Sequence, residues 1–91
     1  MSAFRDSTVA FIGTGTMAEA MIKGILSRKL ITPEKITGSG PRPARGEELN
    51  ARYSIQTTTS NTEAADGGSI VVLSVKPQVL PKVLDELANH I

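Results

Sequence analysis

The chain has 91 residues, which is the size of a single small domain and leaves no room for two. Its composition, 40% hydrophobic and 21% charged, is typical of a soluble globular protein rather than a collagen-like or disordered chain. A net charge of +1 argues against a nucleic-acid partner, and the absence of cysteine excludes disulfides and thiolate metal sites. No stretch resembles an export signal or a membrane span, so we expect a cytoplasmic protein that binds neither membrane nor metal.

The first part of the chain predicts a strand followed by a helix. Residues 9–12 form a short apolar run, which is typical of a strand buried on both faces. Residues 16–29 place apolar side chains four residues apart, as a helix does. Thr16 and Glu19 have the spacing of a capping box at the helix start. Gly24 inside the helix suggests that the backbone closely approaches a neighbouring strand.

The middle of the chain continues this alternation. Residues 35–39 predict a second strand, and residues 44–53 predict an amphipathic helix with Leu49 on its apolar side. Residues 54–58 favour a strand but are polar, as expected at an outer position of a sheet. Residues 60–66 predict a short third helix that ends at a pair of glycines.

The end of the chain completes the pattern of an α/β protein. Residues 70–75 are nearly all apolar and β-branched, which predicts a central strand, and residues 79–91 follow helical spacing. Strands alternating with helices predict a Rossmann-like parallel sheet with right-handed crossovers. Four strands match the first half of a doubly wound domain, with strand order 3-2-1-4. We therefore expect residues 1–91 to be an N-terminal dinucleotide-binding fragment whose fourth strand has a free edge.

A glycine-rich turn follows the first predicted strand and reads Gly13-Thr14-Gly15-Thr16-Met17-Ala18. This is the G-x-G-x-x-A form of the dinucleotide fingerprint, and it lies between a strand and a helix as the fingerprint requires. Gly13 would allow the tight turn, Gly15 the approach of a pyrophosphate, and Ala18 close packing of the helix. Because a helix start favours anions, we predict that these six residues bind the cofactor. The alternatives are a turn that only serves packing and a site for S-adenosylmethionine.

The end of the second predicted strand indicates which dinucleotide is bound. A site for NAD expects an acidic residue there to accept the ribose 2′-OH, but Ser39 and Gly40 occupy this place. Arg42 and Arg45 follow. Hydroxyl and guanidinium donors suit a 2′-phosphate, so Ser39 and Arg42, with Arg45 as a further candidate, predict NADP(H) in preference to NAD(H). The alternative for the two arginines is a solvent-exposed helix start.

Four other residues have weaker claims to a role. Val75, Lys76 and Pro77 lie where the fourth strand leaves the sheet, so their main-chain atoms could line the cofactor cleft. Lys76 could also act as a base, but a lysine is more often a solvated charge. Asn61 could cap the third helix or reach the ligand. No nucleophile has a recognisable basic partner, so we expect no catalytic residue in this chain.

Three stretches of the chain resemble pyrroline-5-carboxylate reductases. They are FIGTGTMAEAMIKG at residues 11–24, PRP at residues 41–43 and SVKPQ at residues 74–78. The resemblance spans nearly the whole chain and is far more specific than the glycine turn. It departs from the usual pattern at Thr16, where Asn is frequent, at Ser74, where Ala is common, and at Ser69, where Asp is common.

The resemblance implies an oxidoreductase that reduces 1-pyrroline-5-carboxylate to L-proline by hydride transfer from NAD(P)H, the last step of proline biosynthesis. It also implies a C-terminal helical domain, absent here, that binds the substrate and forms a homo-oligomer, so this chain alone would be inactive. By the same resemblance the turn would hold the pyrophosphate, with Ser39 and Arg42 at the adenosine 2′ position. Asn61 would contact the cofactor, and residues 75–77 would lie beside the nicotinamide ribose.

Two other functions stay open from the sequence. A protein of the same family could bind NADP(H) without catalysis, as a sensor or an interaction module. A β-hydroxyacid dehydrogenase could share a similar N-terminal domain, although such enzymes usually read G-x-M-G after the turn and lack V-K-P-Q.

Overall fold

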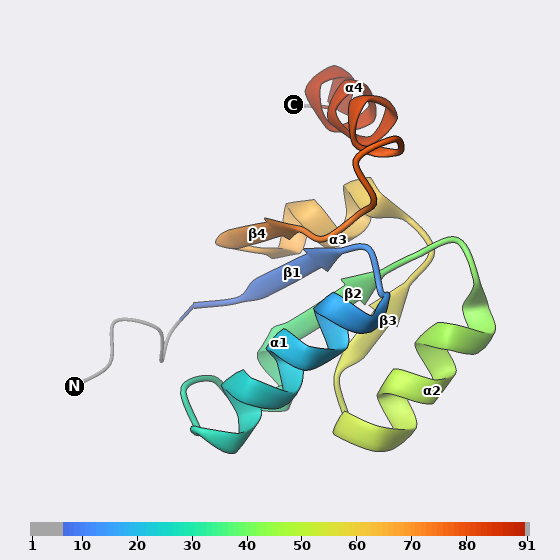
Figure 1. Cartoon of the computed structure of the whole chain (residues 1–91). Coiled ribbons are helices and arrows are strands. Elements are labelled where there is room, and N and C mark those ends of the chain that lie inside the picture. Colours follow the sequence, from blue (N-terminus) through green and yellow to red (C-terminus); the bar gives the residue numbers. More distant parts are fainter. Residues whose placement is uncertain (1–6, 91) are drawn as a thin grey trace.

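The computed structural model describes residues 7–90 (Figure 1). Its elements are β1 (Val9–Ile12), α1 (Thr16–Ser27), a 3-10 turn (Pro33–Lys35), β2 (Ile36–Ser39), α2 (Pro43–Tyr53), β3 (Gln56–Thr58), α3 (Asn61–Gly67), β4 (Ile70–Leu73) and α4 (Leu80–His90). All the predicted strands and helices are confirmed, with ends that differ by one or two residues. Ile91, the last residue of the predicted final helix, lies outside the described residues. No helix within residues 7–90 is long and apolar enough to cross a bilayer.

The four strands form one parallel sheet in the order β3-β2-β1-β4, which confirms the predicted Rossmann-like α/β fold. In the register of the sheet, Phe11 of β1 lies between Gly38 of β2 and Val72 of β4. Helices α1 and α2 cover one face of the sheet, and α3 covers the other, with α4 packed beside α3 (Figure 1). All four residues of β1 are buried because this strand has a neighbour on each side and helices on both faces.

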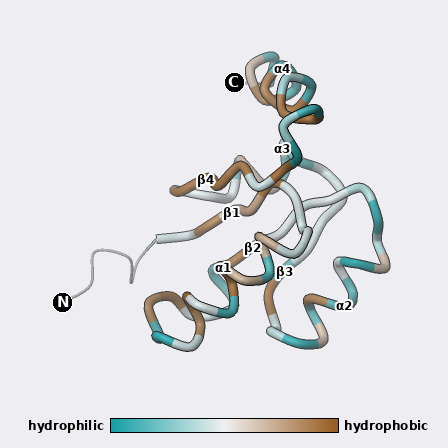
Figure 2. The backbone as a smooth tube through the Cα atoms, in the orientation of Figure 1, coloured by the Kyte–Doolittle hydropathy of each residue, from teal (hydrophilic) through white to brown (hydrophobic). Residues whose placement is uncertain are grey.

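The sheet divides the hydrophobic core into two parts. Phe11 and Ile36 pack with Ile22 and Leu49 on the side of α1 and α2. Ala10 and Ile12 pack with Ala64 and Val83 on the side of α3 and α4. Alternate residues of β1 thus supply opposite cores, as strand geometry requires. Figure 2 shows the hydrophobic colouring concentrated along β1 and β4, which lie between the two helical layers.

The fourth strand is at the edge of the sheet, so the prediction of a central strand at residues 70–75 is wrong. Within the described residues β4 pairs with β1 alone, and its residues alternate between half-buried and exposed. Val71 and Leu73 are each 40% exposed. An apolar, β-branched strand is typical of the centre of a sheet, but β4 has this composition at the edge. The predicted free edge of the fourth strand is confirmed.

Two local expectations for α1 are also wrong. The N-cap of α1 is Gly15, and no side chain caps the helix, because Thr16 is already inside it. The Glu19 carboxylate therefore does not close a capping box and instead accepts hydrogen bonds from three side chains of α2. No atom of the described chain lies within 4 Å of a Cβ built at Gly24, apart from its own turn of helix. Close approach to a strand does not explain this glycine.

Candidate functional site

The glycine turn is tied to the ends of both strands that flank β1. The Gly13 N–H donates to the Ser39 carbonyl at the end of β2, with an N–O distance of 2.8 Å. On the other side, the Ser74 N–H donates to the Ile12 carbonyl at 2.8 Å, just beyond β4. In open parallel sheets, ligands bind outside the carboxyl ends of the strands. The turn lies at this edge of the sheet.

Gly13 is a glycine for two independent structural reasons. Its φ of +107° lies in a region that side chains disfavour. A Cβ built on it would lie 2.6 Å from the Ser74 carbonyl oxygen and 2.9 Å from Cγ1 of Val75. The Ser74 hydroxyl also donates to the Gly13 carbonyl at 2.9 Å. The serine that departs from the resemblance therefore holds the turn against the end of β4.

Gly15 differs from Gly13, because nothing in the described chain requires it to be a glycine. Its backbone is extended, with φ of −81° and ψ of −165°, which any residue adopts. No atom lies within 4 Å of a Cβ built at this position. Gly15 is exposed and lines a groove of about 500 Å³ that runs along the turn. The missing side chain thus leaves open space on the surface of the groove.

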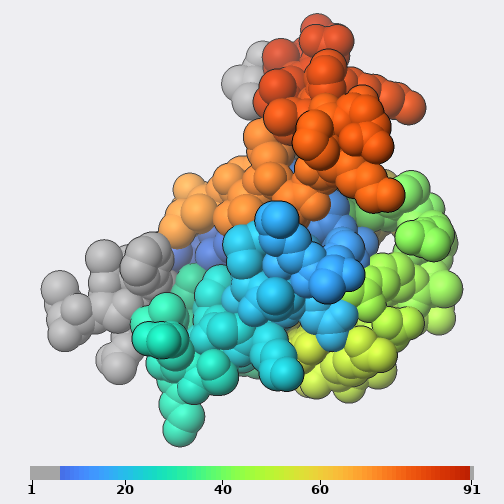
Figure 3. Space-filling view, in the orientation of Figure 1, coloured from blue at the N-terminus to red at the C-terminus, as the bar shows by residue number. Residues whose placement is uncertain are grey.

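The groove brings together residues from three of the predicted site segments. It is lined by Gly13, Thr14, Gly15, Thr16, Glu19, Pro41, Arg42, Arg45, Ser74, Val75, Lys76 and Val79. In Figure 3 the blue start of α1, the green segment before α2 and the orange segment before α4 converge at this place. Met17 and Pro77 are exposed but do not line the groove, and Ala18 is buried against β1 and its neighbours.

A second hollow, of about 300 Å³, continues from the groove toward α3 and α4. Its lining includes Ser39 and Asn61, together with apolar side chains from Pro41 and Val79. The buried Ser39 hydroxyl donates to Asn61 Oδ1 at 2.8 Å, and the Asn61 amide donates to Glu86 at 2.8 Å. Asn61 thus stands beside Ser39 at the edge of the sheet.

Asn61 does not cap α3, so that alternative is wrong. The N-cap is Ser60, whose hydroxyl accepts from the Glu63 N–H at 3.2 Å. Asn61 is the first residue inside the helix, and its side chain is free to turn toward β2 and α4.

A third hollow, of about 190 Å³, lies between the start of α2 and the end of β3. Exposed Arg42, the N-cap residue of α2, lines both this hollow and the groove. Thr14 also lines both, and its side chain would meet a Cβ built at Gly40. Glu47 lines the third hollow as well, so the positive charge of Arg42 has an acidic neighbour there.

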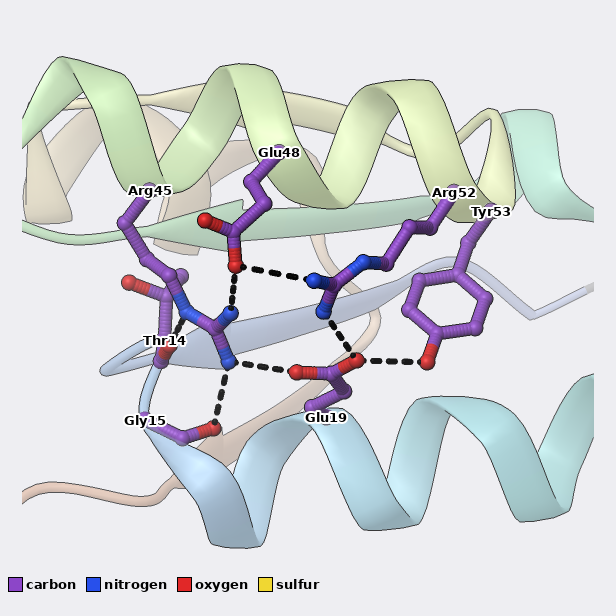
Figure 4. A network of polar contacts seen from close by, with 7 residues as sticks. All are labelled: Thr14, Gly15, Glu19, Arg45, Glu48, Arg52 and Tyr53. Carbon is purple, nitrogen blue, oxygen red and sulfur yellow. Dashed lines mark hydrogen bonds and ion pairs between the residues drawn. The ribbon is translucent and has the colours of Figure 1, made fainter.

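Arg45 makes contacts that the sequence alone does not reveal (Figure 4). From α2 it reaches back to the glycine turn, where its Nε donates to the Thr14 carbonyl at 2.7 Å. Its two other nitrogens bond the carboxylates of Glu19 and Glu48, each at 2.6 Å. Each of its three guanidinium nitrogens is therefore engaged by a contact within the protein.

Glu19 is the centre of this network. Its carboxylate accepts from Arg45, from the Tyr53 hydroxyl at 2.6 Å and from Arg52 at 2.9 Å. These bonds, that of Tyr53 foremost, lower the pKa of Glu19 to about 2. The bond to Glu19 in turn raises the pKa of Arg45 and of Tyr53. Glu19 is therefore ionised at neutral pH, and its charge offsets that of the arginines beside the groove.

Lys76 lies at the rim of the groove, and its main chain bonds the residues at the start of α4. Its carbonyl accepts from the N–H groups of Val79 and Leu80, at 2.9 and 3.2 Å. The side chain of Lys76 is exposed. With Arg42 it supplies positive charge to the rim of the groove.

Comparison with known proteins agrees with this geometry. Residues 8–91 match the protein family described as NADP oxidoreductase, coenzyme F420-dependent. The pyrroline-5-carboxylate reductase of Synechocystis sp. is 39% identical over 89% of this chain and 30% of its own length. That of Corynebacterium melassecola is 37% identical over 91% of this chain and 30% of its own length. The chain thus spans about 30% of the length of these curated relatives.

Solved structures give the same picture. The structure of a pyrroline-5-carboxylate reductase from Coxiella burnetii has a TM-score of 0.86 and 28% identity, covering 91% of this chain and 30% of its own. The pyrroline carboxylate reductase of Plasmodium falciparum, with NADP bound, has a TM-score of 0.80 and 25% identity, covering 97% of this chain and 31% of its own. The resemblance to pyrroline-5-carboxylate reductases is therefore confirmed. By its match over residues 8–91, the chain belongs to the NADP oxidoreductase, coenzyme F420-dependent family.

Proposed function

We propose that this chain binds NADP(H) as the dinucleotide-binding part of a pyrroline-5-carboxylate reductase. The observation that carries the proposal is Gly15, which neither backbone conformation nor packing requires to be a glycine. A glycine at this point of a strand–turn–helix unit lets a pyrophosphate approach the backbone. The similarity to reductases, one of them solved with NADP bound, supports the same conclusion.

The proposed pyrophosphate site is the turn from Gly13 to Ala18. The first N–H groups of α1 have no partner within the helix, and its N-terminus carries a partial positive charge. Thr14, Thr16 and Met17 contribute main-chain atoms of this turn. The start of α1 and the positive charges of Arg42 and Lys76 lie along the same groove, and both favour binding of an anion there.

The adenosine half of the cofactor is proposed to extend from the turn into the second hollow. Pro41 and Val79 offer apolar surface for the base, and the hydrogen-bonded pair of Ser39 and Asn61 offers polar atoms beside it. Arg42 is the main candidate to bind the 2′-phosphate, which is the basis for preferring NADP(H) over NAD(H). The nicotinamide half would lie toward Val75, Lys76 and Pro77, where β4 leaves the sheet.

When bound, NADPH supplies a hydride for the imine carbon of 1-pyrroline-5-carboxylate. The part of this chain in that reaction is to bind and orient the dinucleotide and to exclude water from it. A small-molecule substrate, a homo-oligomer of the longer protein and a cytoplasmic location belong to the same proposal. The chain spans about 30% of the length of its relatives, so we expect the remaining length to supply the contacts to the imine.

The test has a binding part and an activity part. Calorimetric titration with NADP⁺, NAD⁺ and S-adenosylmethionine at fixed salt is expected to show binding of both dinucleotides, with NADP⁺ the tighter. Binding of S-adenosylmethionine alone would overturn the proposal. With NADPH and 1-pyrroline-5-carboxylate we expect the 91-residue chain to form no measurable proline. Turnover by this chain would show that the substrate contacts are already within it.

A further inference from the structure

We infer that Arg45 is a positioning residue, which sets the glycine turn in the conformation that receives the phosphates of the dinucleotide. The inference rests on the proposed function and adds a residue outside the fingerprint to the same site. Arg45 lies in α2, 31 residues after Thr14, the turn residue whose carbonyl it bonds.

The guanidinium of Arg45 faces two successive carbonyl groups of the turn. Its Nε donates to the Thr14 carbonyl at 2.7 Å, and its Nη2 makes a longer contact of 3.5 Å with the Gly15 carbonyl. The same Gly15 carbonyl accepts the Glu19 N–H at 3.1 Å, the first hydrogen bond of α1. Arg45 therefore holds the turn at the point where it becomes a helix (Figure 4).

Holding these carbonyls also sets the direction of the neighbouring N–H groups. A peptide unit is planar and trans, so the N–H that follows a carbonyl points the opposite way. The carbonyls of Thr14 and Gly15 point to Arg45, and the N–H groups of Gly15 and Thr16 consequently point away from it. These N–H groups belong to the part of the turn proposed to face the pyrophosphate.

The guanidinium is itself held from both sides. Glu19 and Glu48 each accept a bond of 2.6 Å from it, and Glu19 is fixed in turn by the Tyr53 hydroxyl at 2.6 Å. Only 21% of the Arg45 side chain is exposed. A planar fork with several donors can serve two carboxylates and a carbonyl at once, whereas an ammonium group on a flexible stem cannot hold the same geometry.

Arg52 is a matched control for Arg45. It is also an arginine of α2, and it bonds the same carboxylates, at 2.9 Å for Glu19 and 3.4 Å for Glu48. Among the contacts of the described residues, it makes none to a carbonyl of the turn. Loss of Arg52 therefore perturbs the charge network while leaving the turn in place.

The first experiment measures the turn without any ligand, by amide ¹⁵N relaxation in Arg45→Met, Arg45→Lys and Arg52→Met. We expect the order parameters of Gly15 and Thr16 to fall from about 0.85 to below about 0.6 in both Arg45 variants. Arg52→Met should leave them unchanged. Circular dichroism checks folding, and Arg45→Lys decides the question if Arg45→Met does not fold. Unchanged order parameters in the folded Arg45 variants would overturn the inference.

The second experiment measures affinity for NADP⁺ and NAD⁺ in the same variants. Arg45→Lys is expected to weaken both by about tenfold and to keep their ratio, while Arg52→Met changes neither appreciably. A selective loss of NADP⁺ affinity would overturn the inference, since Arg45 would then bind the 2′-phosphate itself. Failure of the unsubstituted chain to bind either dinucleotide would overturn the proposed function, whereas the order parameters would still decide the role of Arg45.

Discussion

The Ser39 hydroxyl donates a hydrogen bond of 2.8 Å to Asn61 Oδ1, and so joins the end of β2 to the start of α3. Ser39 is fully buried, and the amide of Asn61 donates onward to Glu86 in α4. The pair thus connects the sheet to both helices of one layer. It does so at the edge where the adenosine half of the cofactor is proposed to lie.

Ser39→Ala tests what this pair contributes. We expect the free energy of unfolding to fall by about 0.5–1.5 kcal/mol, because the part-buried hydrogen bond to Asn61 Oδ1 is lost. Since the hydroxyl proton is already donated to Asn61, the ratio of NADP⁺ to NAD⁺ affinity should change by less than about twofold. Urea denaturation and calorimetry measure the two quantities. If stability were unchanged and the preference for NADP⁺ over NAD⁺ were lost, Ser39 would instead be a direct ligand of the phosphate.

Gly13→Ala is expected to destabilise the fold. The new Cβ would overlap the Ser74 carbonyl, at 2.6 Å, on a backbone whose φ is +107°. Overpacking of this kind costs about 1–3 kcal/mol, and the unfavourable φ adds to it. The midpoint of urea denaturation should therefore move to lower concentration. A midpoint equal to that of the unsubstituted chain would contradict the close packing of the turn on β4.

Gly15→Ala is the counterpart of that substitution and separates stability from binding. The added Cβ meets no atom within 4 Å, so the free energy of unfolding should change by no more than about 0.5 kcal/mol. The same methyl group would stand where the pyrophosphate approaches, and we expect NADP⁺ affinity to fall at least about tenfold. Full affinity in this variant would mean that the ligand does not come close to the turn at Gly15.

The charge network predicts a specific dependence on acid. The Glu19 pKa is lowered from its usual 4.5 to about 2, so ionised Glu19 stabilises the fold above about pH 4.5. That contribution is lost as the pH falls toward 2. The difference in unfolding free energy between the unsubstituted chain and Glu19→Gln should therefore shrink over this range. Tyr53→Phe should raise the pKa of Glu19 and move the loss to higher pH. A difference that stays constant down to pH 2 would contradict the network.

Arg42→Ala tests the basis of nucleotide preference. Removing a charged donor from a phosphate is expected to weaken NADP⁺ binding by about tenfold to a hundredfold, with little effect on NAD⁺. Glu47→Gln is the converse variant, because it removes the acidic neighbour that lines the same hollow. We expect it to strengthen NADP⁺ binding slightly. Equal losses for both dinucleotides in Arg42→Ala would show that Arg42 does not distinguish them.

The sequence predicts the features that depend on local pattern. The apolar run of residues 9–12 and the apolar period of residues 16–29 indicate a strand and a helix, and the glycines between them predict a phosphate-binding turn. Each of these signals lies within a few neighbouring residues. The strand order also follows, because right-handed crossovers leave few alternatives for such a pattern.

The contacts that shape the site could not be predicted in the same way, because they join residues far apart in sequence. Glu19 and Arg45 are 26 residues apart, and Ser39 and Asn61 are 22 apart. Their pairing depends on which helices share a face of the sheet and on small shifts in helix starts. The N-cap of α1 is Gly15 and not Thr16, so Thr16 and Glu19 form no capping box. The Glu19 carboxylate bonds Arg45 instead.

An NMR titration of the ¹⁵N-labelled chain with NADP⁺ tests directly whether the dinucleotide binds at the glycine turn. We expect saturable shifts of the amide signals in the turn from Gly13 to Ala18, at Gly40 and Arg42, at Asn61 and at Val75 and Lys76. These residues lie at the carboxyl ends of the strands. The amide signals at the opposite end of β4, near Ile70, should not move. Shifts confined to the exposed face of β4 or α4, or no saturable shift at all, would contradict binding at the glycine turn.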